Sequence, residues 1–167
     1  MPLGTGTLIL VCGLPGAGKT TFAKAMARER MAIRMCPDEW IEQILADDGD
    51  AAERDRLRDP VENLQWDLAR EYLGSGFTVI LENGFWAEEE RSLYAMGALE
   101  LGSRIELFFL EADLDLLWNR VQARNAVLER KTWIMSREEV EAAWRQFQPP
   151  QSEELDFYDE SAVIQQV

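Results

Sequence analysis

The sequence Gly13-Leu14-Pro15-Gly16-Ala17-Gly18-Lys19-Thr20 matches the pattern G-x-x-x-x-G-K-[ST] at every position, and this stretch decides the fold. Its glycines let successive backbone N–H groups turn inward around a polyphosphate, a conformation that a Cβ atom would obstruct. In this pattern Lys19 reaches the β- and γ-phosphates, and the Thr20 hydroxyl is placed to bind Mg²⁺. A helix beginning near Lys19 would direct the positive end of its dipole at the same anion. The stretch, with Thr21 directly after it, therefore predicts a binding loop for a nucleoside triphosphate.

Residues on both sides of this loop fit the strand and the helix that such a loop joins. Before it, residues 7–11 (TLILV) form a continuous apolar run with β-branched members, as expected of a strand buried in a parallel sheet. After it, residues 21–30 are rich in alanine, methionine, arginine and glutamate, which favour a helix. We therefore expect a strand over residues 7–11 and a helix over residues 19–30.

The rest of the chain alternates strand patterns with helical patterns. This alternation is typical of an α/β fold with a parallel sheet covered by helices on both faces. The length of 167 residues suits one domain. Including the first strand, we expect a sheet of five strands. The further strands are expected over residues 31–36, 77–81, 104–110 and 162–167, and the further helices over residues 37–45, 59–73, 87–102, 113–127 and 136–147.

Local signals place some of these boundaries. The residues at 136–139 (SREE) form a capping box, which predicts the start of a helix. Asp59-Pro60 has the residue types that begin a helix, with aspartate as N-cap and proline at the first helical position. We therefore expect the polar, charge-dense residues 47–59 to form a loop, and the acidic residues after Pro150 to form another.

The charge and composition of the chain limit the ligands and catalytic groups that we expect. The chain carries 31 acidic and 17 basic residues, a net charge of −14. This charge disfavours binding to long nucleic acids, because their phosphates would be repelled outside the loop, and it is compatible with a neutral or cationic small substrate. No histidine is present, so a general base would be a carboxylate, a lysine, a cysteine or water. Nothing in the sequence indicates the oligomeric state.

The cellular compartment is predicted from features that the sequence does not contain. No apolar stretch approaches the about 20 residues of a membrane span, and the N-terminus has no basic segment ahead of an apolar run. Cys12 and Cys36 are the two cysteines, and they show no CxxC spacing. We expect both to be reduced, buried thiols, and we expect the protein to be cytoplasmic.

Two carboxylates are predicted to lie beside the phosphate-binding loop. Asp38 follows the second expected strand, and Glu82 follows the strand 77–81. Because ligands of open α/β sheets bind beyond the carboxyl ends of the strands, we expect Asp38 to take or orient the proton of an attacking hydroxyl. It could also be a helix N-cap, and the two roles can coexist. Glu82 can hold Mg²⁺ directly or through water. Glu39 and Glu42 are weaker alternatives to Asp38.

Two arginines are predicted to contact phosphate oxygens. Arg120 and Arg124 are four residues apart on the expected helix 113–127 and so share one face. Their guanidinium groups could clamp phosphates and neutralise charge in a transition state, or could simply lie on a solvated face. The basic residues at 129–131 add charge nearby. Trp40 and Trp86 follow the two carboxylates and could line an acceptor pocket.

With these residues assembled, the chain resembles the small P-loop kinases of the AAA-type "predicted kinase" group, which are related to chloramphenicol phosphotransferase, zeta toxin and the kinase domains of polynucleotide kinases. The resemblance spans nearly the whole chain. It rests on the loop 13–20, on Asp38 within residues 37–39, on residues 79–86 with Arg91 beyond them, and on residues 120–125 and 147–150.

The resemblance implies a single nucleotide-kinase-like P-loop NTPase domain over residues 1–167, with a lid at about residues 120–136. It also implies ATP and Mg²⁺ as cofactors, with Asp38 as the base that activates the acceptor. Arg120 and Arg124 would be lid arginines, and the loop with Pro149 would flank the adenine. The family commonly has aspartate where this chain has Glu82, and we expect the longer side chain still to reach the metal, directly or through water.

Five nucleotide-binding functions are compared. A GTPase would have N-K-x-D and D-x-x-G, and neither occurs. A motor-type AAA ATPase would have an Asp-Glu pair where this chain has Glu82-Asn83. The remaining hypotheses are an ATP-dependent kinase of a small hydroxylated molecule, a polynucleotide 5′-hydroxyl kinase, and a nucleotide-binding or ATPase regulatory module. The first of these uses all the features and is the one that we expect.

Overall fold

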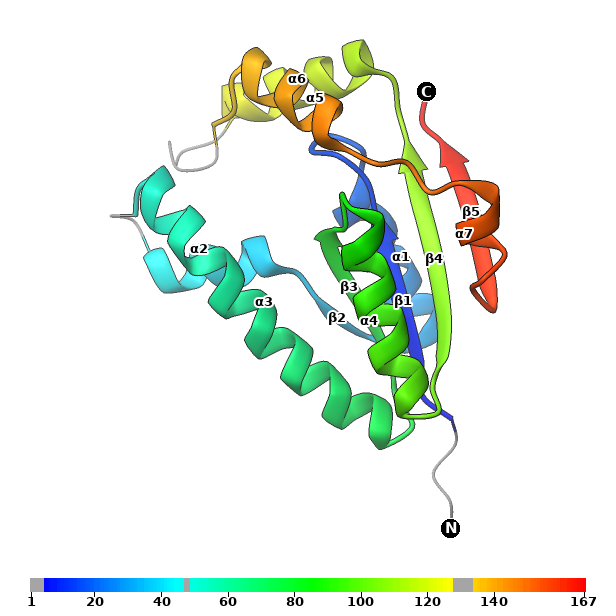
Figure 1. The fold of residues 1–167 in the computed structure, drawn as a ribbon. Coiled ribbons are helices and arrows are strands. Elements are labelled where there is room, and N and C mark those ends of the chain that lie inside the picture. The colour runs from blue at the N-terminus through cyan, green and yellow to red at the C-terminus, as the bar shows by residue number, and fades with distance from the viewer. Residues whose placement is uncertain (1–4, 47–48, 128–133) are drawn as a thin grey trace.

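The computed structural model, which describes residues 5–46, 49–127 and 134–167, contains a parallel sheet of five strands (Figure 1). The strands lie in the order β2-β3-β1-β4-β5, and every neighbouring pair is parallel. This confirms the predicted α/β fold. The strand bounds are β1 Thr7–Cys12, β2 Ile33–Met35, β3 Thr78–Gly84, β4 Arg104–Glu111 and β5 Glu160–Gln165.

Helices cover both faces of the sheet because the side chains of the central strand alternate between them. In β1, Leu8 and Leu10 belong to one buried cluster, and Ile9 and Val11 belong to the other. The first cluster includes residues from α3 (Ala51–Gly74) and α4 (Glu88–Glu100). The second includes residues from α1 (Lys19–Arg30), α5 (Leu114–Val127) and α6 (Arg137–Gln146). Figure 1 shows α5 and α6 above the carboxyl end of the sheet.

Strand register brings the functional segments to one edge. Leu10 of β1 lies opposite Leu81 of β3 and Leu107 of β4. The segments that follow these positions therefore leave the sheet side by side, and the backbone N–H of Gly13 donates to the carbonyl of Gly84 at 3.0 Å. The helix α2 (Pro37–Leu45) begins at the same edge, directly after β2. The carboxyl ends of the strands thus form one surface, as the fold class requires.

The prediction for residues 47–59 was wrong. Residues 47–48 lie outside the described part of the chain, but helix α3 already begins at Ala51, and Pro60 lies inside it instead of starting it. The helix begins at a capping box, in which the Asp50 side chain accepts from the N–H of Glu53 at 2.9 Å and Glu53 bonds back to Asp50. A stripe of buried side chains that ends at Leu73 then packs the helix against the sheet. The helix therefore tolerates the loss of the backbone hydrogen bond that proline cannot donate.

The other predicted elements occur with shifted ends. Strand β3 continues through Gly84, so Glu82 lies within the strand and not after it. The acidic stretch after Pro150 contains the short helix α7 (Ser152–Leu155), which was not predicted. The capping box at Ser136 is confirmed, because its hydroxyl accepts from the N–H of Glu139 at 3.2 Å. No helix in the described ranges is both long enough and apolar enough to cross a membrane.

Candidate active site

The phosphate-binding loop runs from the end of β1 to the start of α1, with glycines where the backbone turns. Gly16 and Gly18 have φ angles of 86° and 90°, which a residue with a side chain rarely adopts. A Cβ atom on Gly16 would also lie 2.8 Å from the carbonyl oxygen of Leu117. Gly18 is the N-cap of α1, so the N–H groups of the first turn point toward the loop. This is the geometry that binds a phosphate.

Lys19 and Thr20 open helix α1 and line the cleft beside the loop. The ammonium group of Lys19 donates to the carbonyl of Leu14 at 3.0 Å. Loss of hydration lowers the pKa of Lys19, and the carboxylates of Asp38 and Glu82 act in the opposite direction. The hydroxyl of Thr20 donates to Oε1 of Glu82 at 2.7 Å. The sequence-predicted lysine, hydroxyl and acid therefore lie together.

Glu82 is almost fully buried and is neutralised by an arginine that the sequence analysis did not single out. Its side chain is 1% exposed, and its Oε2 accepts from Nη1 of Arg34 at 2.6 Å. The second amino group of Arg34 donates to Glu39 at 2.5 Å. These two bonds raise the pKa of Arg34 against the cost of its burial, and Arg34 in turn lowers the pKa of Glu39. Glu39 therefore serves Arg34 as a partner.

Asp38 lies at the second position of helix α2 and faces the same cleft as Lys19. Its carboxylate is about half exposed, at 54%, and accepts from Nη2 of Arg58 in α3 at 2.5 Å. The N-cap of α2 is Cys36, so the alternative role of Asp38 as N-cap is wrong. Burial raises the pKa of the Cys36 thiol to about 12, and that of Cys12 likewise, which leaves both cysteines protonated. Asp38 is thus an exposed carboxylate of the cleft, and its role as base stays a prediction.

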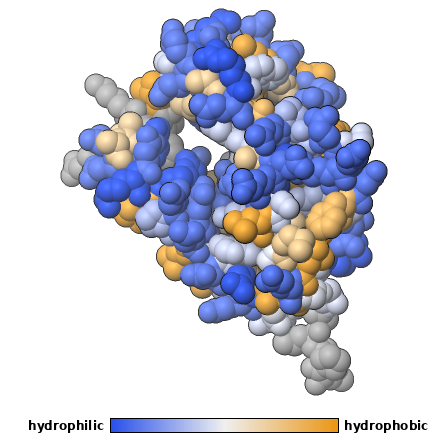
Figure 2. Space-filling model, viewed as in Figure 1, coloured by the Kyte–Doolittle hydropathy of each residue, from blue (hydrophilic) through white to orange (hydrophobic). Residues whose placement is uncertain are grey.

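A single cleft of about 680 Å³ joins the loop to Asp38. Figure 2 shows a hollow between the arm formed by α2 and α3 and the end formed by α5 and α6, with mostly hydrophilic residues around it. The lining contains both signs of charge. Its basic members are Lys19, Arg54, Arg58 and Arg124, and its acidic members are Asp38, Asp55, Glu62, Glu82, Glu90 and Glu139.

The side of the cleft formed by α3 and α4 is rich in carboxyl groups. Burial raises the pKa of Glu62 to about 7; Glu90 adds to this rise, and Arg58 opposes it from 3.6 Å. Burial also raises the pKa of Glu90. Burial therefore favours the protonated form of Glu62. The acidic character of this side disfavours a ligand that carries further negative charge there.

The two arginines predicted to form a clamp have different contacts in the structure. Arg124 lines the cleft, where loss of hydration lowers its pKa and the carboxylate of Asp38 opposes this effect. Arg120 lies beside the loop, where it donates to the carbonyl of Gly16 and to the side chain of Gln166, each at 3.3 Å. The basic residues predicted at 129–131 lie outside the described part of the chain, as does part of the lid predicted at 120–136.

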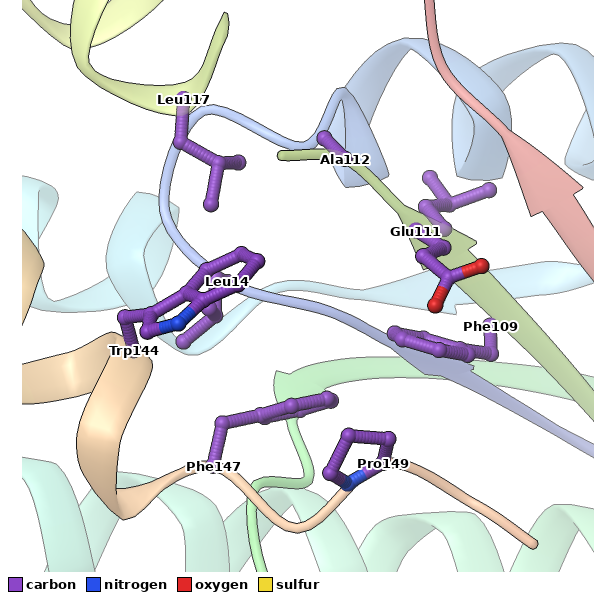
Figure 3. Close-up of a pocket in the computed structure, with 9 residues that line it drawn as sticks. Leu14, Phe109, Glu111, Ala112, Leu117, Trp144, Phe147 and Pro149 are labelled. Carbon is purple, nitrogen blue, oxygen red and sulfur yellow. The ribbon is translucent and has the colours of Figure 1, made fainter. Parts of the chain in front are cut away.

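Pro149 lines a second, apolar cavity of about 190 Å³ (Figure 3). The cavity shares Leu14 with the phosphate-binding loop, and Phe147 forms one wall, where its ring stacks on Phe109 at 5.3 Å between centroids. Figure 3 shows the carboxylate of Glu111 beside Phe109 at the edge of this hollow, and this carboxylate accepts from Nε2 of Gln165 in β5. The loop at 147–150 therefore lies next to the phosphate site, and a role for Pro149 beside the adenine stays a prediction.

The turn after β3 carries Trp86 into the main cleft. Phe85 has a φ of 50°, which is unusual for a residue with a side chain, and the buried guanidinium of Arg91 donates to its carbonyl at 2.9 Å. Arg91 also pairs with Glu154 of α7 at 2.6 Å. Arg91 therefore supports the turn and does not face the cleft. Trp40, by contrast, is not among the residues that line it.

The side chains at the start of α1 fit a hard divalent cation held jointly with a nucleotide. Thr20 and Glu82 offer oxygen atoms 2.7 Å apart, and oxygen ligands are those that Mg²⁺ prefers. In the described ranges, no group of three or more histidine, cysteine, aspartate or glutamate side chains is placed to hold a metal on its own.

The chain belongs to an AAA domain family (AAA_33), whose model matches residues 8–150. The match runs from β1 to the loop after α6, and so includes the phosphate-binding loop, Asp38 and Glu82. This confirms the resemblance to the small AAA-type P-loop kinases. The protein is thus of the P-loop phosphotransferase or nucleotide-binding kind. No curated protein matches the chain.

Solved structures with the same fold include proteins of different kinds. A protein from Chloroflexus aurantiacus j-10-fl, assigned as a kinase, is 21% identical with a TM-score of 0.77, over 96% of this chain and 88% of that one. A gluconokinase from Sinorhizobium meliloti 1021 is 16% identical with a TM-score of 0.63, over 98% and 83%. A chain of the Pnkp1/Rnl/Hen1 RNA repair complex is 16% identical with a TM-score of 0.70, over 93% of this chain and 47% of that one. At these identities the likeness shows the fold alone.

Proposed function

We propose that the protein is an ATP-dependent phosphotransferase that moves the γ-phosphoryl group of ATP to a hydroxyl group of a small molecule. The observation that carries this proposal is the single cleft shared by Lys19, Thr20 and Asp38. A module that only bound a nucleotide would need no carboxylate beyond the phosphate site. Asp38 is also exposed at 54%, so that an acceptor can reach it.

In the proposed reaction, the acceptor hydroxyl lies against Asp38, which orients it and receives its proton. The hydroxyl oxygen forms a bond to the γ-phosphorus, the bond from that phosphorus to the β,γ-bridging oxygen breaks, and ADP leaves with the bonding electrons. Lys19 and Arg124 face the cleft and counter the negative charge on the transferred group. Holding both reactants in one cleft lowers the entropic part of the barrier.

Mg²⁺ would be held by Thr20, with Glu82 behind it, together with the phosphates. When bound, the cation supplies charge neutralisation between the β- and γ-phosphates. The role of this chain is to fix the hydroxyl of Thr20, which it does through the 2.7 Å bond to Glu82.

For the nucleotide, we propose contacts on both flanks of the loop. Arg120 holds the carbonyl of Gly16 and lies near Gly18, at the side where the loop joins α1. The apolar cavity at Pro149 would take the adenine, because an aromatic ring and a carboxylate suit a flat base with an exocyclic amino group. A nucleotide with adenine is therefore favoured as the donor.

The acceptor is proposed to be small and to carry no net negative charge. Glu62 and Glu90 form the far side of the cleft, and the chain has a net charge of −14. Both features would repel the phosphates of a long nucleic acid. The polynucleotide 5′-hydroxyl kinase is therefore the weaker hypothesis, and the regulatory ATPase is the other.

The experiment is a transfer assay with γ-labelled ATP, Mg²⁺ and a panel of neutral and cationic hydroxyl compounds, with a 5′-hydroxyl oligonucleotide as a separate arm. We expect label on at least one small compound and none on the oligonucleotide at low salt. Labelled oligonucleotide would favour the polynucleotide kinase. Slow ATP hydrolysis that no acceptor changes, and that Asp38→Asn leaves unaltered, would favour the regulatory module.

A further inference from the structure

Arg34 lies between the two halves of the proposed active site. It is the middle residue of the short strand β2, and its side chain is only 13% exposed. One amino group donates to Glu82 at 2.6 Å, beside the phosphate-binding loop, and the other donates to Glu39 at 2.5 Å. Glu39 is the residue after Asp38 in helix α2. The guanidinium therefore links the acid on the metal side to the helix that carries the proposed base.

The same contacts fix the direction in which Glu82 points. Its Oε2 is occupied by Arg34, and its Oε1 accepts from the hydroxyl of Thr20 at 2.7 Å. With its proton directed at Glu82, the Thr20 oxygen keeps its lone pairs for a cation. A lysine at position 34 could not reproduce this arrangement, because an ammonium group is a point charge and not a planar fork.

We propose that Arg34 is a positioning residue: it holds Glu82 against Thr20 and keeps that carboxylate from binding the metal ion directly. The inference rests on the proposed function only in requiring that the site bind a nucleotide with a divalent cation. The glutamate side chain reaches Thr20 and Arg34 together, so it contacts the hydration shell of the cation instead of the cation itself.

The test is carried out on the complete protein with Mn²⁺ and ADP in D₂O. The deuterium modulation of the Mn²⁺ electron spin echo measures how many water molecules are ligands of the ion. We expect the wild type and Glu82→Gln to give equal modulation, because Glu82 is not a ligand. In Arg34→Gln the freed carboxylate replaces a water, so the modulation decreases. Adding Glu82→Gln to Arg34→Gln should restore it, since an amide is a poor ligand.

The turnover of ATP hydrolysis in Arg34→Gln should fall about 10- to 100-fold.

Arg30→Gln is the matched control. Arg30 also joins a buried glutamate, Glu106, to an exposed one, Glu160, but it does so away from the cleft. Its removal should leave the modulation unchanged. If Arg34→Gln does not fold, Arg34→Lys is the second variant, and it should give a smaller decrease because it keeps a positive charge beside Glu82 but lacks the planar fork of arginine.

Unchanged modulation in Arg34→Gln, or a rise in Glu82→Gln alone, would overturn the proposal. Failure of every variant and of the wild type to bind Mn²⁺ with ADP would overturn it together with the proposed function. If the modulation changes as expected but no acceptor is phosphorylated, the proposed function fails alone, because the measurement needs no acceptor.

Discussion

Helix α1 begins and ends beside a buried glutamate of the sheet. At its start, Thr20 donates to Glu82 at 2.7 Å, and at its end, Arg30 donates to Glu106 at 3.1 Å. The two glutamate side chains are 1% and 3% exposed. Each glutamate also shares an arginine with a second glutamate, through Arg34 at one end and Arg30 at the other. The two ends therefore carry the same ionic arrangement.

What differs is the surroundings of the two arrangements. Glu106 lies in the first half of β4, and burial raises its pKa while Arg30 opposes the rise. Its side chain pairs with Arg30, which in turn pairs with Glu160, and Glu106 does not line the cleft. Glu82 lies at the carboxyl end of β3, where a hydroxyl and the phosphate-binding loop meet it. A buried ion pair thus does not by itself indicate a functional site, and we infer a function for Glu82 because ligands of open α/β sheets bind at the carboxyl ends of the strands.

The largest expected effect is that of Lys19→Ala at the cleft end of α1. We expect turnover of ATP to fall between about 100- and 1,000-fold, because the variant lacks a preorganised charge that acts on the phosphates. Lys24→Ala, which removes an exposed lysine of the same helix that pairs with Glu39 at 3.4 Å, is the control and should retain most of the activity. Retained activity in Lys19→Ala would contradict the assignment of the loop.

The comparison of the two ends of α1 predicts that two substitutions will have similar effects on stability but different effects on activity. Arg34→Gln and Arg30→Gln each remove a partner from a buried carboxylate, so each should lower the free energy of unfolding by about 2 kcal/mol. Only Arg34→Gln should also lower the turnover of ATP, by about 10-fold or more. Urea denaturation and a steady-state assay of both variants check this. Equal losses of activity would show that the two ends do not differ in function.

The smallest expected effect is the pH dependence of stability that Glu62 contributes on the acidic side of the cleft. Burial raises its pKa from 4.5 to about 7, so its stabilising contribution is complete below pH 4.5 and is lost as the pH rises through 7. Between pH 5 and pH 8, the wild type should therefore lose on the order of 1 kcal/mol relative to Glu62→Gln, after allowance for screening by solvent. Urea denaturation across this range checks it, with the exposed Glu71→Gln as control. Parallel curves for the wild type and Glu62→Gln would contradict the prediction.

The sequence predicted the fold best where local pattern and burial agree. Residues 7–30 were predicted almost to the residue, because the apolar strand, the glycines of the loop and the helix formers all favour the same structure. The start of α3 was missed because residues 50–59 are polar and charge-dense. Asp50 with Glu53 has the capping-box spacing, and that signal could have found the helix.

The sequence predicted the main residues of the candidate site but not the arginines that bond to its carboxylates. Lys19, Thr20 and Glu82 meet as expected, and Asp38 shares their cleft. Arg34 and Arg58 were missed, although each bonds to one of the two carboxylates. Arg58 lies in the segment predicted to be a loop. A charged residue inside the short strand at Arg34 was the available signal, but only the pairing of β2 with β3 shows what it contacts.

The central claim, phosphoryl transfer assisted by a carboxylate at the end of β2, is tested most directly by Asp38→Asn. With an acceptor found in the panel, we expect transfer of labelled phosphate to fall about 100-fold, since a general base contributes at least that much, while the affinity for ADP is unchanged. Asp59→Asn, an exposed aspartate of α3, is the matched control and should transfer phosphate at the wild-type rate. Transfer by Asp38→Asn at the rate of Asp59→Asn would contradict the account.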